Sequence, residues 1–401
     1  MIYWIWLAER IGYGNPKLKK LLLHFYNALN IYKADPKTYA AEFGLDDREV
    51  KSLSNKSLKR CENIINACNE NDIKIISISD ASYPECLRNI DNPPAVLYYK
   101  GELPDFSNLP SISLVGTRKA DTYSIKAAWS LSARLSLANF IVVSGGALGI
   151  DSAAHKGAMD TNGITVALLA CGINYPYLKS NEELRKSILE GGCLISEFPP
   201  DYPLKKFSFH LRNRLISGIS LGTVIIEAGE NSGALITARN ANEQGRDVFV
   251  ITGKPDDKKY QGSYALLRDG AIPVFKAEDI ISEYLHIYGN VIDAEKALNF
   301  DLSALYTEKY SVKTAPKTVV KTEKTANQEA EEKIFSKNLY ETLSKNAKLV
   351  YNCINMDNFT VDDLITPELS FSEVLSVVTE LELSGLITAI PGGRYTKLYK
   401  E

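Results

Sequence analysis

Cysteine and histidine are scarce in this chain of 401 residues, which contains six of the former and four of the latter. They are scattered along the sequence, and no two cysteines form a CxxC pair. Structural zinc sites need such closely spaced ligands, and secreted disulfide-rich domains need more cysteine than this. The sequence therefore predicts no metal site and favours the reducing environment of the cytoplasm.

Long hydrophobic runs are also missing. The apolar residues at the start are interrupted by Glu9 and Arg10, and neither a basic leader nor a small-residue cleavage site accompanies them. A membrane-spanning helix needs about 20 apolar residues in succession. We therefore expect neither a signal peptide nor a membrane span.

Two common nucleotide-binding signatures are absent. The phosphate-binding loop G-x-x-x-x-G-K-[ST] occurs nowhere in the chain. A dinucleotide-binding domain needs G-x-G-x-x-G after its first strand and an acidic residue about 20 residues later, whereas the first candidate turn here reads "GTRKAD". ATP hydrolysis and NAD binding are disfavoured, and we expect no cofactor.

The net charge of −3 gives no hint of a polyanionic partner, but the charges are unevenly distributed. Four cations and no acid lie between Tyr202 and Ile226. From Glu341 to the end of the chain, nine Asp and Glu residues outnumber five Lys and Arg residues. The chain thus combines a basic segment in its middle with an acidic end.

Short apolar runs recur at regular intervals in the middle of the chain. They read "SISLVG", "FIVVSGG", "TVALLACG", "CLISEFPP", "TVIIEAGE", "DVFVITGK" and "AIPVF", with helical patterns between them. Strands that are apolar on both faces and alternate with helices indicate a parallel sheet covered on both sides. We predict an α/β fold, an extended Rossmann-like doubly wound sheet, over residues 110–288.

The segments around this domain have different textures. Residues 1–75 show apolar residues at helical spacing, and "IGYGNPKL" is similar to the turn of a helix-hairpin-helix, although a plain helical turn also fits. A proline-rich connector is expected over 76–109, and a flexible linker rich in Lys, Thr, Ala and Glu over 289–338. Residues 339–401 have the order of three helices and two strands joined by "PGGR", which fits a winged helix.

Glycine stands at the carboxyl ends of most predicted strands, the edge at which open α/β sheets bind ligands. Glycine lets backbone amides approach an anion closely, and a following helix N-terminus adds a favourable dipole. The expected anion-binding residues at this edge are Arg118, Ser144, Gly145, Gly146, Gly149, Asn231, Ser232, Gly233 and Thr237. Of their neighbours, Asp151 is predicted to cap the helix that follows, and His155 to be a packed helix residue.

The basic segment reads "YPLKKFSFHLRNRLISGIS". Cations beside aromatic rings suit single-stranded nucleic acid, since unstacked bases need a ring to lie on and the backbone needs positive charge. The residues that provide these groups are Lys205, Lys206, Phe207, Phe209, Arg212 and Arg214. Alternatively, both phenylalanines belong to the core, and Arg212 pairs with an internal acid such as Glu227.

Taken together, these motifs resemble the DNA-processing protein A (DprA/Smf) family of bacteria. The resemblance rests on "SLVGTR", "VVSGGALGIDSAAH", "SEFPP", "FHLRNRLISGIS", "VIIEAGENSGALITARNANEQGRDVFVITG" and "GSYALLRDGAIPVF", and it runs from about Tyr83 to Phe275. The flanking segments are also similar to those of the family, an N-terminal sterile-alpha-motif-like or helix-hairpin-helix domain and a C-terminal winged helix.

The resemblance implies a protein without catalytic turnover. It implies single-stranded DNA binding, a homodimer formed through the Rossmann-like domain, and help in loading the RecA recombinase onto incoming strands during natural transformation. Carried over by position, the DNA-binding residues are Arg118, the turn from Ser144 to Gly149, Lys206, Phe209, and the R-N-R residues Arg212, Asn213 and Arg214.

The chain departs from the family pattern at several positions. Leu148 stands where the family often has arginine, His210 where it has proline, and Ile251 and Thr252 precede a glycine where it writes V-P-G. The loss of a cation at Leu148 puts one phosphate contact in doubt.

Two alternatives stay open. Glu197, Glu227 and Glu230 follow predicted strands, so a nucleotide-binding enzyme related to the "lonely guy" phosphoribohydrolases is conceivable. The signature of those enzymes, P-G-G-x-G-T-x-x-E, is absent, because the "PGG" at Pro391 continues with Arg394. The expected winged helix carries Glu373, Glu380 and Glu382 on its "FSEVLSVVTELELSG" segment, so we expect residues 341–401 to contact protein or act as a lid.

Overall fold

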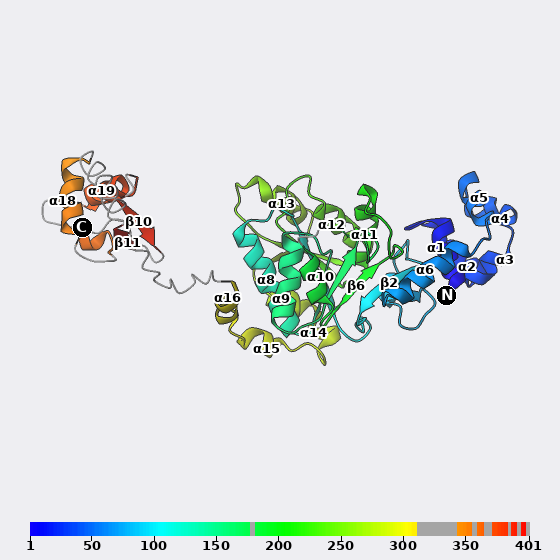
Figure 1. The fold of residues 1–401 in the computed structure, drawn as a ribbon. Helices are drawn as coiled ribbons and strands as arrows, with labels where there is room; N and C mark the ends of the chain where they lie inside the picture. Colours follow the sequence, from blue (N-terminus) through cyan, green and yellow to red (C-terminus); the bar gives the residue numbers. More distant parts are fainter. Residues whose placement is uncertain are drawn as a thin grey trace. The chain divides into compact units, whose positions relative to one another are not determined.

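The structure is a computed structural model of the chain, and it describes residues 1–176, 181–310, 343–354, 359–364, 371–383, 386–390 and 394–397. The chain divides into two compact units, Met1–Tyr306 and Thr307–Glu401 (Figure 1). Of the predicted linker, residues 311–338 lie outside the described residues.

A mixed sheet of nine strands forms the centre of the first unit. In chain order the strands are β1 (Lys74–Ser77), β2 (Val96–Gly101), β3 (Ser111–Gly116), β4 (Ile141–Ser144), β5 (Thr165–Leu169), β6 (Cys193–Ser196), β7 (Gly222–Ile226), β8 (Asp247–Ile251) and β9 (Ile272–Val274). Their spatial order is β1-β2-β6-β5-β4-β3-β7-β8-β9. The strands from β6 to β9 are parallel, and β2 and β1 extend the sheet by antiparallel pairing.

Helices cover both faces of the parallel strands, as the burial of consecutive residues in β4, β5, β6 and β7 requires. One group consists of α8 (Thr122–Leu137), α9 (Ile150–Asp160) and α10 (Glu182–Ile188), which lie side by side in Figure 1. In another group, α11 (Lys206–Gly218) packs against α12 (Ala234–Glu243). Further along the chain lie η2 (Lys258–Tyr260), α13 (Gln261–Arg268) and α14 (Glu278–Tyr288). The prediction of a Rossmann-like α/β sheet is confirmed, and each of the seven apolar runs forms a strand.

The strand order reverses between β3 and β7. These two strands are adjacent and parallel, with Ile112 opposite Gly222 and Gly116 opposite Ile226. The chain winds from β3 toward β6 in one direction and from β7 toward β9 in the other. Such a switch point leaves a crevice at the carboxyl ends of the two strands, which is where ligands bind in open α/β sheets.

The predicted connector and linker both contain regular structure. Residues 76–109 contribute part of β1, the short helix α7 (Glu85–Arg88) and β2, because the edge of β6 offers hydrogen bonds to an antiparallel neighbour. The first part of the predicted linker forms α15 (Ala294–Asn299) and α16 (Leu302–Tyr310). Arg134 of α8 donates a hydrogen bond of 2.5 Å to the carbonyl of Ala297, which ties α15 to the sheet domain.

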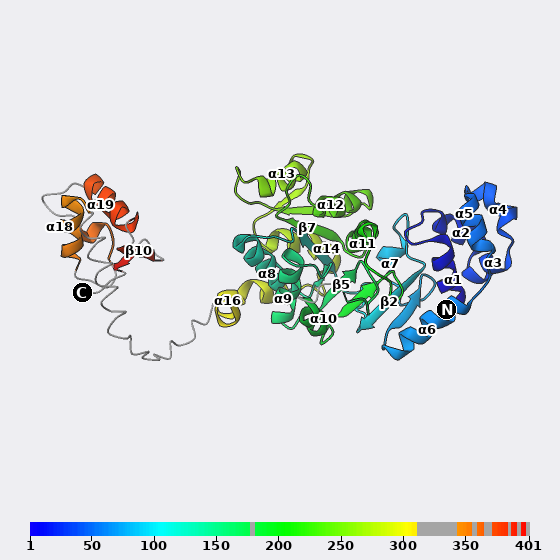
Figure 2. The ribbon, with the colours of Figure 1, turned by 45° about the horizontal axis from the view of Figure 1, so that its top comes forward.

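Six short helices precede the sheet, in agreement with the predicted helical character of residues 1–75. They are α1 (Ile2–Ile11), α2 (Lys17–Phe25), α3 (Ala28–Lys33), α4 (Pro36–Phe43), α5 (Asp47–Ser54) and α6 (Lys59–Glu70). Trp6, Leu21 and Ile31 lie in one apolar cluster with Tyr98 of β2 and Leu169 of β5. Figure 2 shows these helices beside β2. They therefore share a hydrophobic core with the sheet.

The second unit contains α18 (Lys345–Cys353), η3 (Asp362–Leu364), α19 (Phe371–Leu383) and the antiparallel strands β10 (Ile387–Ile390) and β11 (Arg394–Lys397). Val350, Val374 and Leu381 belong to its separate apolar core. The residues Pro391 to Gly393, predicted to form the turn between the two strands, lie outside the described residues. Among the described residues, no helix is long and apolar enough to cross a membrane.

Candidate functional site

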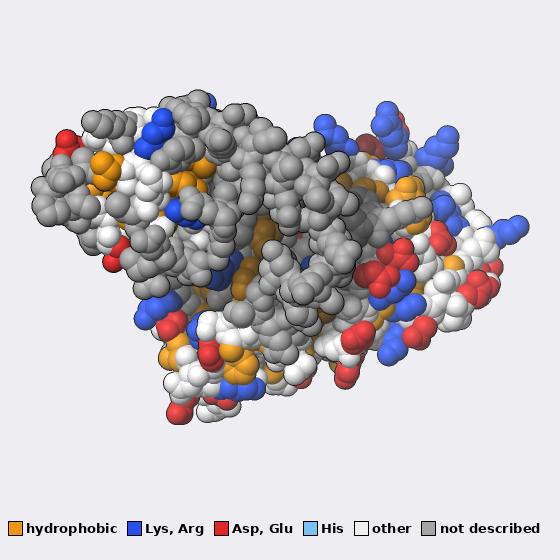
Figure 3. Space-filling view, turned by 60° about the vertical axis from the view of Figure 1, so that its left-hand side comes forward, with side chains coloured by type: hydrophobic (Ala, Val, Ile, Leu, Met, Phe, Trp, Pro, Cys, Tyr) orange, Lys and Arg blue, Asp and Glu red, His pale blue; other side chains and the backbone are white. Residues whose placement is uncertain are grey.

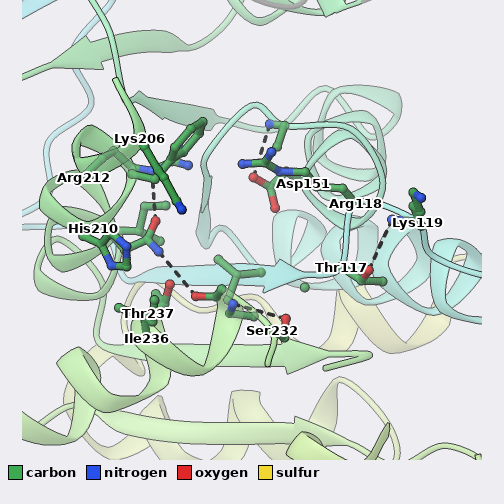
Figure 4. A pocket seen from close by; sticks show the side chains of 18 residues that line it. Thr117, Arg118, Lys119, Asp151, Lys206, His210, Arg212, Ser232, Ile236 and Thr237 are labelled. Carbon is green, nitrogen blue, oxygen red and sulfur yellow. Dashed lines mark hydrogen bonds between the residues drawn. The ribbon is translucent and has the colours of Figure 1, made fainter. Parts of the chain in front are cut away.

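A cavity of about 500 Å³ lies at the switch point between β3 and β7. Its walls come from the loop after β3, from one side of α11 and from the first turns of α12 (Figure 4). The predicted site residues that line it are Arg118, Lys206, Phe209, Arg212, Asn213, Ser232, Gly233 and Thr237. The fold thus brings together residues that are more than a hundred positions apart in the sequence.

One face of α11 supplies a stripe of polar and aromatic groups to the cavity. Lys206, Phe209, His210 and Asn213 follow the i, i+3, i+4, i+7 spacing of neighbours on a helix face, and all four line the cavity. Lys206 and His210 are exposed, and Phe209 is partly buried. The alternative in which Phe207 belongs to the core is wrong, because 49% of this residue is exposed.

The loop after β3 carries Arg118 on the opposite wall, and Glu227 at the end of β7 holds this loop in place. The carbonyl of Glu227 accepts a hydrogen bond of 3.2 Å from the amide of Thr117. Its carboxylate accepts one of 3.0 Å from the amide of Asp121. Glu227 is 2% exposed and has a left-handed backbone, with φ of 55°. It therefore acts as a positioning residue for the loop that carries Arg118.

Arg118 and Phe209 meet across the cavity. The guanidinium carbon of Arg118 lies 4.7 Å from the centre of the Phe209 ring, within the range of a cation–π contact. No carboxylate of a described residue lies within 4.0 Å of the charged groups of Arg118, Lys119 or Lys206 in the structure. Positive charge beside an aromatic ring is therefore open to a ligand at this site.

The presence of Lys and Arg side chains does not by itself distinguish the cavity from the rest of the surface. On the face shown in Figure 3, the Lys and Arg side chains of the described residues alternate with Asp and Glu side chains. The cavity differs from that face because its lining contains four cations, Arg118, Lys119, Lys206 and Arg212, and one carboxylate, that of Asp151.

The carboxylate of Asp151 accepts hydrogen bonds from its own loop. This corrects the prediction that the glycine-rich turn binds a phosphate. The Oδ2 atom of Asp151 accepts hydrogen bonds from the amides of Gly145 at 3.1 Å and of Ala147 at 3.3 Å. Helix α9 begins at Ile150 with Gly149 as its N-cap, so Asp151 is not the capping residue. The turn binds this internal carboxylate with the amides that we expected to bind a phosphate.

Ser144, Gly145 and Gly146 are buried and are therefore excluded from the ligand surface. The hydroxyl of Ser144 donates a hydrogen bond of 2.6 Å to the carbonyl of Leu114. The carbonyl of Gly146 accepts one of 3.1 Å from the side chain of Asn181. The strand-end position of this turn was predicted correctly, but its polar groups are directed into the protein.

Arg212 belongs to the wall of the cavity but is almost completely buried. It is 5% exposed, and its Nη1 donates hydrogen bonds to the carbonyls of Gly145, at 2.7 Å, and of Leu168. A Cβ atom on Gly145 would lie 2.1 Å from that nitrogen, so a side chain at this position would displace Arg212. These contacts hold Arg212 in the wall of the cavity, and the suggested pair with Glu227 stays a prediction.

Arg214 does not reach the cavity, contrary to our prediction. It is 4% exposed, and its Nη2 lies 2.5 Å from the carboxylate of Glu197, which is equally buried. Burial raises the pKa of Glu197, and the charge of Arg214 opposes that rise. The same carboxylate accepts a hydrogen bond of 3.1 Å from the amide of Gly14, in the turn between α1 and α2. Arg214 and Glu197 thus join the N-terminal helices to the sheet domain.

His155 is a packed helix residue, as predicted. It is completely buried, and its Nδ1 lies 2.8 Å from the hydroxyl of Thr165. Burial, together with the positive charge of Arg212, lowers its pKa to about 3. His155 is therefore neutral at physiological pH.

Lys119 and His210 line the cavity but were not predicted as site residues. The signals available for them were the position next to Arg118 and the helical spacing from Lys206. Glu227 was considered as an enzyme acid or as the partner of Arg212, but its contacts with the loop after β3 could not be predicted, because they depend on the pairing of β3 with β7.

Known proteins are similar to this chain in sequence. The family described as DNA recombination-mediator protein A matches residues 74–285. Protein Smf of Escherichia coli strain K12 is 30% identical over 358 residues, which cover 88% of this chain and 85% of that protein. Protein Smf of Synechocystis sp. is 28% identical over 403 residues and is covered over 98% of its length, as is this chain.

A solved structure agrees with these sequence relatives. The X-ray structure of DNA processing protein A (DprA) from Streptococcus pneumoniae has a TM-score of 0.62 and 30% sequence identity, and the match covers 71% of this chain and 98% of that one. The matched family covers the whole sheet and its switch-point cavity. On these grounds, the chain belongs to the DNA recombination-mediator protein A (DprA/Smf) family.

Proposed function

We propose that this chain binds single-stranded DNA in the switch-point cavity and helps to load the RecA recombinase onto incoming strands during natural transformation and recombination. One observation carries the proposal. The cavity adjoins a second one of about 490 Å³, since Thr117, Lys119 and Ser232 line both. A small nucleotide needs one pocket, whereas a strand needs consecutive ones.

The chemistry of the cavity suits a single strand better than a duplex. Arg118 and Lys206 supply positive charge for phosphates, and the ring of Phe209 provides a surface for an unstacked base. The second cavity adds Lys258 and Lys259. Bases in a duplex are already stacked and would gain nothing from Phe209. The names of the relatives, which describe DNA processing, support a nucleic acid ligand.

The proposed activity is binding without catalysis. The alternative enzyme of the phosphoribohydrolase type needs a carboxylate that can move a proton. Glu197 is bound to Arg214 and Gly14, and Glu227 to the loop after β3. Asp151 accepts two backbone amides. Glu230, the remaining acid of this alternative, is exposed and lines the second cavity. We favour binding over turnover because the other acids are held by the protein.

The flanking domains are proposed to serve other partners. The N-terminal helices fit a sterile-alpha-motif-like or helix-hairpin-helix domain, but the amide of Gly14 in its turn faces Glu197 and not a phosphate. The second unit fits a winged helix. Its helix α19 has Glu373 in its first turn and no basic residue in its last, which favours contact with protein, or a role as a lid, over contact with DNA.

A homodimer formed through the Rossmann-like domain is part of the proposal. A groove of about 400 Å³ beside α8 is lined by Tyr123, Phe275 and Leu298, all of which are large exposed apolar residues. Such residues are enriched where a second chain packs. Sedimentation equilibrium of the wild type and of Phe275→Glu tests this surface, and a dimer that persists in the variant would place the interface elsewhere.

The binding proposal is tested by fluorescence anisotropy with single- and double-stranded oligonucleotides. We expect Arg118→Ala and Lys206→Ala each to weaken single-strand binding roughly tenfold, the effect of one charge-assisted contact. Lys156→Ala is the matched control, because this lysine is exposed on α9 outside the cavity lining. Equal affinity of all four proteins would remove the site, and release of free base from a nucleoside monophosphate would favour the enzyme.

Loading of RecA is tested separately. RecA filament formation on DNA coated with a single-strand-binding protein should be faster with the wild type than without it. Lys206→Ala should lose this effect in proportion to its loss of DNA affinity. Normal DNA binding without any effect on filament formation would restrict the function to DNA binding.

A further inference from the structure

The start of α11 and the loop before it carry a second group of aromatic and basic residues that do not line the cavity. It consists of Tyr202, Lys205 and Phe207, which we call the outer platform. The amino group of Lys205 lies 5.0 Å from the centre of the Tyr202 ring and 5.8 Å from that of Phe207. The three side chains thus form one continuous cluster.

The outer platform is open to a ligand. Lys205 is exposed and Phe207 is 49% exposed, although a phenylalanine on a helix usually packs inward. No carboxylate of a described residue lies within 4.0 Å of Lys205 in the structure. Asp201, the acid next to Tyr202 in the sequence, accepts a hydrogen bond from the side chain of Asn174.

Helix geometry gives the platform its direction. Lys206 and Phe209 face the cavity, whereas Phe207 is followed at i+4 and i+7 by Leu211 and Arg214. These two side chains lie against Gly14, in the turn between α1 and α2. The platform therefore begins at the rim of the cavity and leads toward the N-terminal helices.

Tyr202, at the base of the platform, packs against other aromatic rings. The Tyr202 ring stacks on Phe198, with 4.7 Å between the ring centres and 13° between the planes. Its other neighbour is Tyr13, whose ring centre is 5.5 Å away in an edge-on arrangement. Because Tyr202 is packed on two sides, its own ring loses little conformational entropy when a ligand binds.

We propose that the outer platform is a second stacking subsite, on which a nucleotide lies after the strand leaves the cavity toward the N-terminal helices. This inference rests on the proposed function. An exposed ring with a cation beside it meets the two needs of a single strand, a base-stacking surface and a positive charge for the backbone. The subsite lengthens the path that already includes the switch-point cavity and the cavity next to it.

The test measures affinity against strand length with the full chain. Oligothymidylates of about 4 to 16 nucleotides cover the usual site sizes of single-strand-binding folds. The variants are Phe207→Ala, Phe207→Leu, which keeps apolar bulk without a ring, and Lys205→Gln. Phe300→Ala is the matched control, since Phe300 is 40% exposed and lies outside both cavities.

We expect the shortest strands to bind the wild type and all variants equally. For longer strands, Phe207→Ala and Phe207→Leu should lose about fivefold or more in affinity, as stacking on one exposed ring predicts. Lys205→Gln should reduce the slope of log affinity against log salt by about 0.7, the contribution of one phosphate contact on a single strand.

Three outcomes would overturn the inference. The variants could keep the full dependence on length, or they could lose affinity equally at every length, which would place their effect in the cavity. They could also bind DNA normally and lose only the effect on RecA, which would make the platform a protein-binding surface. Failure of the wild type to bind any strand would instead refute the proposed function.

Discussion

The carboxylate of Asp151 accepts a hydrogen bond of 3.1 Å from the amide of Gly145, inside the turn that the sequence suggested for a phosphate. Burial raises the pKa of this carboxyl, and the charge of Arg212 opposes the rise. An acid of the protein thus occupies the anion-binding turn. The groups that remain for the proposed ligand are those of Arg118, Lys206 and Phe209 in the cavity wall.

Replacing Asp151 by asparagine should destabilise the protein modestly, because the amides of Gly145 and Ala147 would lose a charged acceptor. Hydrogen bonds to a charged group contribute about 1.5 to 3 kcal/mol. Burial disfavours the charged carboxylate, and Asn keeps one oxygen for the two amides, so we expect a loss at the lower end of that range. Urea unfolding of Asp151→Asn and of Asp256→Asn, an exposed control, measures the effect. If single-strand affinity falls while the unfolding midpoint stays unchanged, Asp151 serves the ligand directly.

The buried pair of Arg214 and Glu197 should contribute to stability and not to DNA binding. Glu197→Leu alone leaves a buried guanidinium, so we expect it to lower the free energy of unfolding by about 3 to 5 kcal/mol. Adding Arg214→Leu should recover part of that loss. A double-mutant cycle by urea denaturation, with DNA affinity measured on the folded proteins, checks both statements. Additive losses would show that the two residues act independently.

His155 should make stability fall as the pH falls. In the unfolded chain its pKa is about 6.5, and in the folded protein it is lowered to about 3. Between these values the unfolded state binds the proton and the folded state does not, so stability drops by up to about 1.4 kcal/mol per pH unit. Above pH 6.5 the effect is absent.

The variant His155→Asn isolates this effect, since asparagine keeps a polar atom near Nδ1 for Thr165. The difference in unfolding free energy between wild type and variant, measured from pH 7.5 to pH 4.5, should shift in favour of the variant below pH 6.5. A difference that does not change with pH would mean that His155 is protonated in the folded protein.

Leu148 should be a site where affinity can be gained. It is 40% exposed in the turn before α9. Leu148→Arg adds a cation near the cavity, so we expect single-strand affinity to rise by roughly threefold to tenfold at low salt, with a steeper dependence on salt. Leu148→Gln is the uncharged control. An equal gain in both variants would point to the loss of the apolar side chain as the cause.

Removal of the second unit should leave DNA binding largely intact. A chain ending at Tyr306 keeps the whole first unit, including α15 and its contact with Arg134. We expect its affinity for single strands to stay within about twofold of the full chain, because the acidic α19 offers phosphates no attraction. A loss of most of the affinity would show that residues 307–401 bind DNA.

The sheet could be predicted from the sequence because its strands are buried on both faces. Runs such as that of β7, in which five consecutive residues are buried, alternate with helical patterns, which is typical of a parallel sheet covered on both faces. The antiparallel strands β1 and β2 were missed because they lack such fully buried runs. β2 has partly buried residues at Tyr99 and Lys100, and its pairing depends on the distant edge of β6.

The site could be predicted in part. Residues whose side chains leave the carboxyl edge of the sheet, such as Arg118 and Thr237, line the cavity as expected. The sequence could not show that Asp151 turns back to the amides of its own loop, or that Arg214 meets Glu197. The sequence does not show whether a charged residue faces a ligand or a buried partner.

Pairing of β3 with β7 joins stretches of chain that leave the ribosome far apart in time. The loop that carries Arg118 is synthesised early, but the wall formed by Ser232 and Thr237 follows only after α11 and β7. The cavity is thus complete only after α12 has been synthesised, and a chain that stops before Ser232 lacks one of its walls.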